Sequence, residues 1–336
     1  MPVKIGIAGT NFISDWFVNA TASLSEVKVS AVYSRTSERG CEFALRHGIA
    51  KSYTDYSEML DSDIDAVYIA SPIFKHKEQA QMAISHGKHV LCEKMMTADL
   101  ESARELRDMA KAGGVVLLEA MRPAFDPLFA ELRARLPEIG RIHSAHFEFC
   151  QYSSRYDRFK AGEVTNAFNP TIGNSALSDI GIYPLHMLVS LFGAPRSVES
   201  EAQLLENGFE GEGRLKLAYD EMDATVVYSK IRGSDTPSVI AGELGEIRID
   251  KISAPTRLSV ITGEKEDIIH SSGESSVIPG YNMKYEIQAF ARMIRGEFDY
   301  RQYLDTTLEA IRIVDASYRQ TGADRYMTEI EAYKTE

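Results

Sequence analysis

The 336-residue chain lacks an excess of basic residues and contains no long apolar run. Lys and Arg number 37 against 49 Asp and Glu, which gives a formal net charge of −12. No basic excess is therefore available to neutralise nucleic-acid phosphates or an anionic membrane surface. No segment approaches the roughly 18 apolar residues that cross a bilayer. We expect neither a nucleic-acid partner nor a membrane partner.

Cysteine is scarce, and the three cysteines, Cys41, Cys92 and Cys150, are far apart. Their odd number and spacing exclude a simple disulfide framework and are typical of free thiols in a reducing compartment. The N-terminal residues MPVKIGIAG lead directly into an expected strand, without the charged and apolar regions of a signal peptide. We therefore expect a cytoplasmic protein.

Residues 1–122 alternate between short β-branched runs and helical stretches. Strands are expected at 3–8, 28–33, 66–70, 89–92 and 115–118, and helices at about 13–23, 37–46, 76–86 and 99–112. This alternation predicts βαβ units and a doubly wound parallel sheet, which is a Rossmann-type α/β domain.

The pattern changes in residues 123–336. A helix at 127–135, a strand at 142–150 and a helix that ends near 192 precede successive strands and turns between 196 and 270, and two helices at about 281–295 and 304–319 follow. We expect a second, α+β domain with a large, mostly antiparallel open sheet.

The segment 69–94, IASPIFKHKEQAQMAISHGKHVLCEK, reads as strand, turn, helix and strand. Lys94 follows the carboxyl end of the last expected strand, the edge at which ligands bind in open α/β sheets. Lys94 is therefore a candidate catalytic residue. Candidate cofactor contacts in this segment are Ser71, Pro72, His76, Glu93 and Lys94 itself.

A glycine turn follows the first expected strand, but it matches the dinucleotide fingerprint only in part. The G-x-G-x-x-G pattern would place glycine at positions 9, 11 and 14, and the chain has Gly9, Asn11 and Ser14. Asn tolerates positive φ, so a tight turn at Asn11 is possible. The alternative is an ordinary βα turn without a ligand. The candidate cofactor contacts here are Gly9, Thr10, Asn11, Phe12 and Ile13.

The second expected strand ends in Ser34 and Arg35, with Arg39 one helical turn further on. An NAD-binding domain usually carries Asp or Glu at this place, where it binds the ribose 2′-hydroxyl. A hydroxyl and two guanidinium groups suit a 2′-phosphate instead. We therefore favour NADP(H), with NAD(H) possible. The alternative is that both arginines are solvated charges at a helix start.

Asp179, Tyr183 and His186 are spaced so that they share one face of a helix. Pro184 prefers the first turn, so the helix is expected to begin near 181–183, with Asp179 just outside it. An acid, a phenol and an imidazole can move a proton to or from an alcohol. The alternative is a helix cap, a half-buried tyrosine and a hydrogen-bonded core histidine. The pair of histidines at 143 and 146 lies on an expected strand, where their spacing directs them to opposite faces, so we expect no metal site.

These stretches resemble the Gfo/Idh/MocA family of oxidoreductases along most of the chain. The resemblance is carried by KIGIAGTNFIS, ASPIFKHKEQAQMAISHGKHVLCEK, LLEAMRPAFDP and ALSDIGIYPLHMLVSLFGAP, of which the last is most similar to the branch with dihydrodiol and sugar dehydrogenases. It implies that Lys94 contacts both nicotinamide and substrate, and that Asp179 and Tyr183 act with it. Met95 stands where the family has proline, and Ile73 where asparagine is common.

The resemblance implies an NAD(P)-dependent oxidoreductase that transfers hydride between nicotinamide and an alcohol or carbonyl of a small sugar, polyol or dihydrodiol. Tyr183 would be the acid/base, Lys94 would polarise the substrate oxygen and Asp179 would orient the substrate. Candidate substrate contacts are His186, Tyr152, Arg155, Tyr156 and Asn169. The exposed sheet of the second domain is expected to form a homodimer or homotetramer.

Two other functions remain open at this point. One is a non-catalytic, dinucleotide-binding sensor or regulatory protein. The other is a redox-neutral enzyme that cleaves glycosides with tightly bound NAD.

Overall fold

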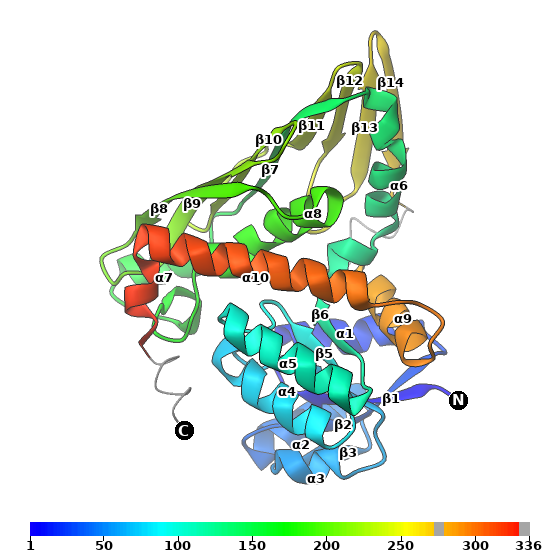
Figure 1. The fold of residues 1–336 in the computed structure, drawn as a ribbon. Coiled ribbons are helices and arrows are strands. Elements are labelled where there is room, and N and C mark those ends of the chain that lie inside the picture. The colour runs from blue at the N-terminus through cyan, green and yellow to red at the C-terminus, as the bar shows by residue number, and fades with distance from the viewer. Residues whose placement is uncertain (272–278, 329–336) are drawn as a thin grey trace. The chain divides into compact units, whose positions relative to one another are not determined.

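The computed structural model describes residues 1–271 and 279–328 (Figure 1). The chain forms two compact units, of which unit 1 is Met1–Arg122 with Ile278–Leu308 and unit 2 is Pro123–Val277 with Glu309–Glu336. The chain leaves unit 1 between Arg122 and Pro123, where the sequence pattern changes. It later returns to unit 1, because helix α9 (Met283–Ile294) packs against the first helix and the second strand. The boundary at residue 122 that the sequence pattern indicates would assign residues 278–308 to the second domain, whereas the structure groups them with unit 1.

Unit 1 is built on a six-stranded, wholly parallel sheet with the strand order β3-β2-β1-β4-β5-β6. Its strands are β1 (Val3–Ala8), β2 (Val27–Tyr33), β3 (Lys51–Tyr53), β4 (Ala66–Ile69), β5 (His89–Glu93) and β6 (Leu117–Ala120). Its helices, besides α9, are α1 (Phe12–Thr21), α2 (Ser37–His47), α3 (Tyr56–Leu60), α4 (His76–Ser85) and α5 (Leu100–Gly113). This strand order reverses direction between β1 and β4, and the carboxyl ends on either side of such a reversal form the ligand-binding crevice of a Rossmann fold.

Unit 1 contains the expected parallel strands and helices, together with one additional strand and one additional helix. Every residue of β4 and β6 is buried, as the near-continuous apolar runs predict. The short elements β3 and α3 were not predicted, because three residues with a polar centre carry no readable period. Asp99 caps α5, where its carboxylate accepts a hydrogen bond from the backbone N–H of Ser102.

Unit 2 is built on an eight-stranded sheet with the order β14-β13-β12-β11-β7-β10-β9-β8. Neighbouring strands are antiparallel except β7 and β10, which are parallel. The strands are β7 (Ile142–Cys150), β8 (Ser197–Leu204), β9 (Glu210–Ala218), β10 (Asp223–Ser229), β11 (Ser238–Gly242), β12 (Gly245–Ile249), β13 (Arg257–Thr262) and β14 (Lys265–His270). The helices are α6 (Pro127–Arg135), α7 (Ser154–Lys160) and α8 (Ile182–Phe192), while α10 (Arg301–Thr321) crosses the division at Leu308.

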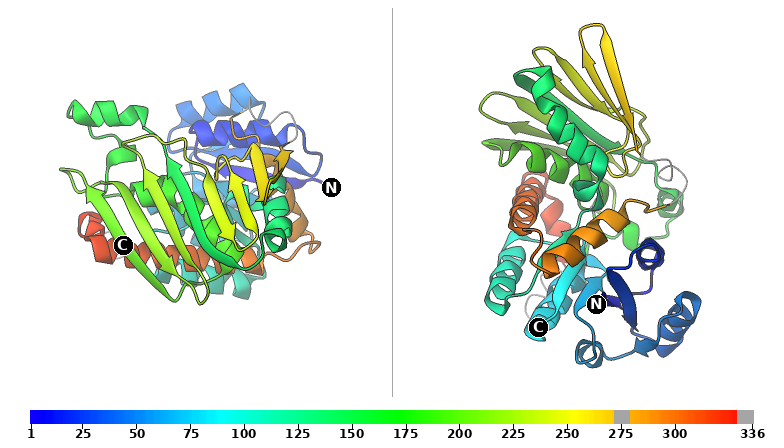
Figure 2. Two further views of the ribbon diagram at one scale, coloured as in Figure 1. Left: turned by 90° about the horizontal axis from the view of Figure 1, so that it is seen from above. Right: turned by 90° about the vertical axis from the view of Figure 1, so that its right-hand side faces the viewer.

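The large sheet presents its two faces to different surroundings. Helix α8 packs on β7 and β10, on the face that carries Phe149 and Tyr228. Along β8 the burial alternates residue by residue, as expected for a sheet with one covered face. The left view of Figure 2 looks onto the broad surface of this sheet. Among the residues that the structure describes, no helix combines the length and the apolarity needed to cross a bilayer.

Candidate active site

The turn between β1 and α1 is formed by Gly9, whose φ is 115°. A Cβ atom at Gly9 would lie 2.9 Å from the backbone oxygen of Ala70, so only glycine allows the ends of β1 and β4 to approach here. Asn11 has an extended backbone and not a positive φ, and it caps α1. Its Oδ1 accepts hydrogen bonds from the N–H groups of Ile13 and Ser14 at 3.0 and 3.3 Å, and its Nδ2 donates to Ala70 at 2.7 Å.

Asn11 and Ser14 therefore replace the missing glycines by specific contacts. Ser14 is buried, and its hydroxyl donates to the carbonyl of Gly9 at 3.0 Å. The cap and this hydrogen bond hold the start of α1 close to the sheet, which is the task of the third glycine in the usual fingerprint. The amino end of α1 remains available to an anion.

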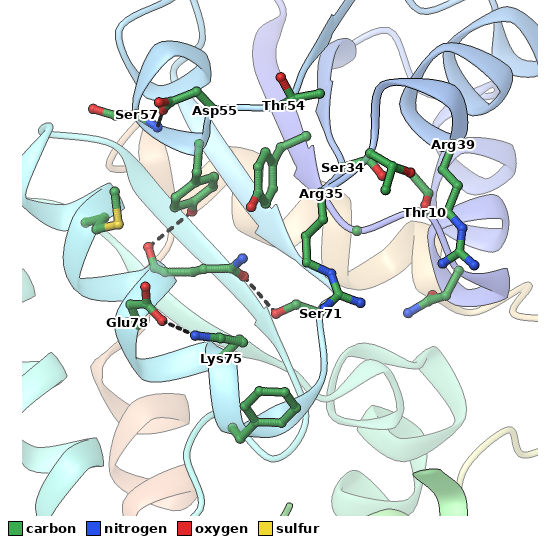
Figure 3. A pocket seen from close by; sticks show the side chains of 18 residues that line it. Thr10, Ser34, Arg35, Arg39, Thr54, Asp55, Ser57, Ser71, Lys75 and Glu78 are labelled. Atoms are coloured by element: carbon green, nitrogen blue, oxygen red, sulfur yellow. Dashed lines mark hydrogen bonds and ion pairs between the residues drawn. The ribbon is translucent and has the colours of Figure 1, made fainter. Parts of the chain in front are cut away.

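A pocket of about 900 Å³ lies at the carboxyl ends of β1, β2 and β4 (Figure 3). This volume suits a cofactor-sized ligand. Seven of the predicted cofactor residues line it, namely Gly9, Thr10, Asn11, Ser34, Arg35, Arg39 and Ser71. The predicted residues Phe12, Ile13, Pro72, His76, Glu93 and Lys94 do not line it.

The charged side chains around this pocket differ in whether other residues of the protein already bind them. Arg35 extends into the pocket in Figure 3, and within residues 1–271 and 279–328 neither Arg35 nor Arg39 forms an ion pair. Asp55 instead caps α3 through the N–H groups that follow it, and Glu78 pairs with Lys75 at 2.8 Å. The pocket therefore offers two guanidinium groups, while its carboxylates are engaged.

The backbone of residues 94–96 is held by three side chains, those of Glu93, His76 and Glu119. Lys94 donates its N–H to Glu93 Oε2 at 3.3 Å, and Glu93 Oε1 accepts from the Tyr68 hydroxyl at 2.6 Å. The ring nitrogens of His76 lie 2.8 Å from the carbonyl oxygens of Met95 and Ser71. The Lys94–Met95 peptide bond is cis, although Met95 is not proline.

The third of these side chains, Glu119, belongs to a group of acids that also contains Glu286, which is buried like Glu119, and Glu93, which is half-buried. Met96 donates its N–H to Glu119 at 2.8 Å, and the Thr307 hydroxyl donates at 3.2 Å. Burial raises the pKa of Glu119 to about 7 and raises the pKa of Glu93 and, more strongly, of Glu286. Burial also lowers the pKa of His76, so this imidazole is neutral at physiological pH.

Asp179 lies in a π-helical turn, Leu177–Gly181, that runs without a break into α8. The α-helix begins at Ile182, within the expected range of 181–183, and Asp179 lies outside it, in the π turn that joins it to the helix. Pro184 falls in the first turn of the α-helical part, where it is tolerated. Gly181 lets this turn approach the sheet, since a Cβ atom there would lie 2.7 Å from Tyr228.

Asp179 forms an ion pair with Lys230, Nζ to Oδ2, at 2.8 Å. Tyr183, one turn along, is largely buried, with its ring 5.9 Å from that of Phe149. His186 is 1% exposed, and burial lowers its pKa to about 3. His186, predicted as a substrate contact or proton relay, therefore presents almost no surface and is a neutral residue inside unit 2.

The other predicted substrate contacts lie around α7, a short helix that the sequence did not predict. Tyr152 donates its hydroxyl to Asp157 at 2.6 Å and is partly exposed. Tyr156 stacks on Phe168, and Asn169 accepts hydrogen bonds from Thr171. The fourth predicted contact, Arg155, is exposed.

Sequence reasoning missed three residues next to the predicted ones: Lys230, Glu119 and Glu286. Lys230 follows the end of β10 just as Lys94 follows the end of β5, so the same signal could have identified it. Glu119 lies in the apolar strand β6 and Glu286 on the buried face of the amphipathic helix α9, and neither pattern reveals a buried acid. Lys94 belongs to unit 1, and Asp179, Tyr183 and Lys230 belong to unit 2.

Two family models match the chain and together cover most of it. Residues 3–121 match the GFO/IDH/MocA model described as "Oxidoreductase family, NAD-binding Rossmann fold". Residues 130–248 match the GFO/IDH/MocA C-terminal domain. The predicted family resemblance and the predicted fold class are both confirmed.

Relatives and solved structures agree with this match over nearly the whole length. The chain is 40% identical to scyllo-inositol 2-dehydrogenase (NADP(+)) IolU of Bacillus subtilis, over 95% of this chain and 97% of the relative. It is 30% identical to the trans-1,2-dihydrobenzene-1,2-diol dehydrogenase of Xenopus tropicalis, over 86% of this chain and 88% of the relative. The fold is similar to that of KijD10, a 3-ketoreductase from Actinomadura kijaniata, with a TM-score of 0.82 and 22% identity over 96% and 98% of the two chains.

Proposed function

The chain belongs to the GFO/IDH/MocA family of NAD(P)-dependent oxidoreductases, and we propose that it oxidises a secondary alcohol of a small polyol or sugar, or reduces the matching carbonyl, with NADP(H) as its preferred cofactor. The observation that carries this proposal is the pocket of unit 1, which has Arg35 and Arg39 at its rim and no acid at the end of β2. IolU is an NADP(+)-dependent dehydrogenase and KijD10 has been solved in complex with NADP, which supports the same choice.

The residues of unit 1 fit a dinucleotide. Gly9 allows close backbone approach, and the amino end of α1 suits the pyrophosphate. Ser34, Arg35 and Arg39 would hold the 2′-phosphate, because a guanidinium group can donate two hydrogen bonds to it. Ser34, Arg35 and Arg39 all line the pocket near the end of β2, where an acid would otherwise bind a ribose hydroxyl.

We propose that three side chains serve the chemical step. A bound nicotinamide would accept or supply the hydride. Tyr183 would take the hydroxyl proton during oxidation and return it during reduction, Lys94 would polarise the substrate oxygen, and Asp179 would orient the substrate. Tyr152, Arg155, Tyr156 and Asn169 would recognise further hydroxyl groups.

The test of this function is a substrate screen followed by one substitution. Inositols, aldoses and dihydrodiols are offered with NADP⁺ and NAD⁺ in parallel, and formation of the reduced cofactor is followed by absorbance. We expect turnover of a polyol or sugar with NADP⁺. If no member of these classes is oxidised and no matching ketone is reduced, the proposed substrate class is wrong.

Lys94→Met is expected to lower kcat by at least about a thousandfold, because the cation beside the reacting oxygen is lost. NADPH affinity, measured by fluorescence titration, should change little, since Lys94 does not line the pocket. Lys28→Met, which removes an exposed lysine from β2, is the matched control and should behave as the unaltered protein. Normal turnover of Lys94→Met would refute the catalytic assignment.

The same assays separate the alternative functions. A dinucleotide-binding sensor would bind NADPH and turn over no substrate. A redox-neutral glycosidase would release sugar from a glycoside without net cofactor reduction and would retain its nicotinamide through purification. Net, stoichiometric formation of NADPH is the result expected for an oxidoreductase.

We further propose that the large sheet of unit 2 forms a homodimer or homotetramer. The sheet face opposite α8 carries, by strand register, Glu148, Val227, Arg214 and Glu201 in one row. Alternating charges of this kind can pair with a second copy related by a two-fold axis. Light scattering should give a dimer or tetramer mass, and Arg214→Glu should reduce it, while Lys28→Glu in unit 1 should not. A monomer mass for the unaltered protein would contradict the proposal.

We also propose a cytoplasmic location, which the free cysteines Cys41, Cys92 and Cys150 support. Fractionation of the source cells tests this location. Recovery of the protein outside the cytoplasm would contradict it.

A further inference from the structure

Lys230 is a buried lysine at the carboxyl end of β10, directly against the turn that carries Asp179. Its side chain is only 5% exposed, whereas that of Asp179 is 42% exposed. Its Nζ donates to the carbonyl oxygen of Ala167 at 2.7 Å and lies 2.8 Å from Asp179 Oδ2. The same nitrogen lies 4.9 and 5.3 Å from the ring centres of Phe168 and Phe209.

This environment is built to hold a cation. Burial of an ammonium group is unfavourable unless it is paired and hydrogen-bonded. The aromatic faces of Phe168 and Phe209 attract the charge, the Ala167 carbonyl accepts a hydrogen bond, and the Asp179 carboxylate balances the charge. The rings themselves form a packed cluster with Phe159, so they cannot move aside without loss of core contacts.

The position of Lys230 is set independently of the π turn. The backbone N–H of Lys230 donates to Gly211, and its carbonyl accepts from Ser153, which ties the residue to β9 and to the start of α7. Asp179 instead lies on a turn that is one residue wider than the α-helix it joins. The buried ammonium group of Lys230 therefore meets a carboxylate that is itself 42% exposed.

We propose that Lys230 is a positioning residue for the reaction: it binds Asp179 Oδ2 and so fixes the direction in which the half-exposed carboxylate faces the substrate. The inference rests on the proposed function, because it assigns Lys230 a role through Asp179. Lys230 is not itself a substrate contact, since its ammonium group is enclosed by Phe168, Phe209 and Ala167.

The first test is Lys230→Met, which keeps the length and the apolar stem but removes the charge. We expect kcat to fall by about ten- to a hundredfold, since a small misplacement of an orienting group has effects of this size. The KM for substrate should change by less than about threefold, and NADPH affinity should be unchanged, because the cofactor pocket lies in unit 1. Lys251→Met, at an exposed lysine of the same unit, is the matched control.

Lys230→Arg and Asp179→Asn complete the test. Arginine keeps the charge and should recover at least about a third of the lost kcat, whereas a role in packing alone would be disturbed more by the larger group. If Asp179→Asn lowers kcat but Lys230→Met does not, Lys230 has no positioning role while the proposed function stands. If Asp179→Asn leaves kcat unchanged, the catalytic assignment of Asp179 fails, and the role of Lys230 fails with it.

A folding defect is distinguished by thermal melting and by NADPH titration of each variant. If the Lys230→Met protein has the same melting temperature as the control and a reduced kcat, the proposal is supported. A loss of kcat that Lys230→Arg does not recover, with a lowered melting temperature in both variants, would overturn it in favour of a structural role.

Discussion

At the scale of single residues, cofactor choice depends on the side chains at the end of β2. Ser34 is buried and Arg35 is exposed, and both line the pocket with Arg39. An acid in place of Arg35 would repel a 2′-phosphate and would accept a hydrogen bond from a 2′-hydroxyl. A single residue can therefore change the order of preference between the two cofactors.

Arg35→Asp is expected to reverse this preference. Loss of charge-assisted hydrogen bonds to the phosphate should weaken NADPH binding by roughly ten- to a hundredfold, while NADH binding should be unchanged or stronger. The measurement is titration of both reduced cofactors by fluorescence. Arg104→Asp, at an exposed arginine of α5, is the control. An unchanged ratio of the two affinities would show that Arg35 is only a solvated charge.

At the scale of elements, the start of α1 shows how a βα turn retains its geometry without the usual glycines. Asn11 combines two tasks: its carbonyl oxygen caps the helix, and its amide group binds the end of β4 through Ala70. The same residue thus joins the two strands that flank the reversal in strand order. The cap and the strand contact can be separated by substitution.

Asn11→Ala removes both contacts and should reduce the free energy of unfolding by roughly 1 kcal/mol, as for other N-caps. Asn11→Asp keeps the cap acceptor but replaces the donor to Ala70 with a negative charge beside the expected pyrophosphate site. This variant should keep most of the stability and bind NADPH less tightly. Chemical denaturation and cofactor titration measure the two effects. Equal stability of Asn11→Ala and the unaltered protein would show that the cap contributes nothing.

At the scale of the whole molecule, buried acids make stability depend on pH. Glu210 of β9 is buried, and this burial raises its pKa from 4.5 to about 7. The folded protein therefore binds this proton more tightly than the unfolded chain. The resulting stability is present below about pH 4.5 and is lost as the pH rises through 7.

Glu210→Gln removes this titration and should flatten the pH dependence. Between pH 5 and pH 8 the unaltered protein should lose roughly 2 to 3 kcal/mol more unfolding free energy than the variant. Other groups with raised pKa values, such as Glu119, are common to both proteins and cancel in the comparison. Urea denaturation at the two pH values measures the difference. If the unfolding free energy changes by the same amount between the two pH values in both proteins, Glu210 does not titrate in this range.

The sequence by itself determined the βαβ order of unit 1, the antiparallel sheet of unit 2 and the strand-end position of Lys94, because these follow from local periodicity and from turn residues. It also placed Arg35 and Asp179 among the candidate residues. Only the tertiary structure decided that Asn11 is a cap with φ of −92°, that His186 is buried, and that α9 returns to unit 1. The pairing of Lys230 with Asp179 joins residues that are far apart in the chain. Such contacts depend on how elements pack, and no local pattern of residues records that packing.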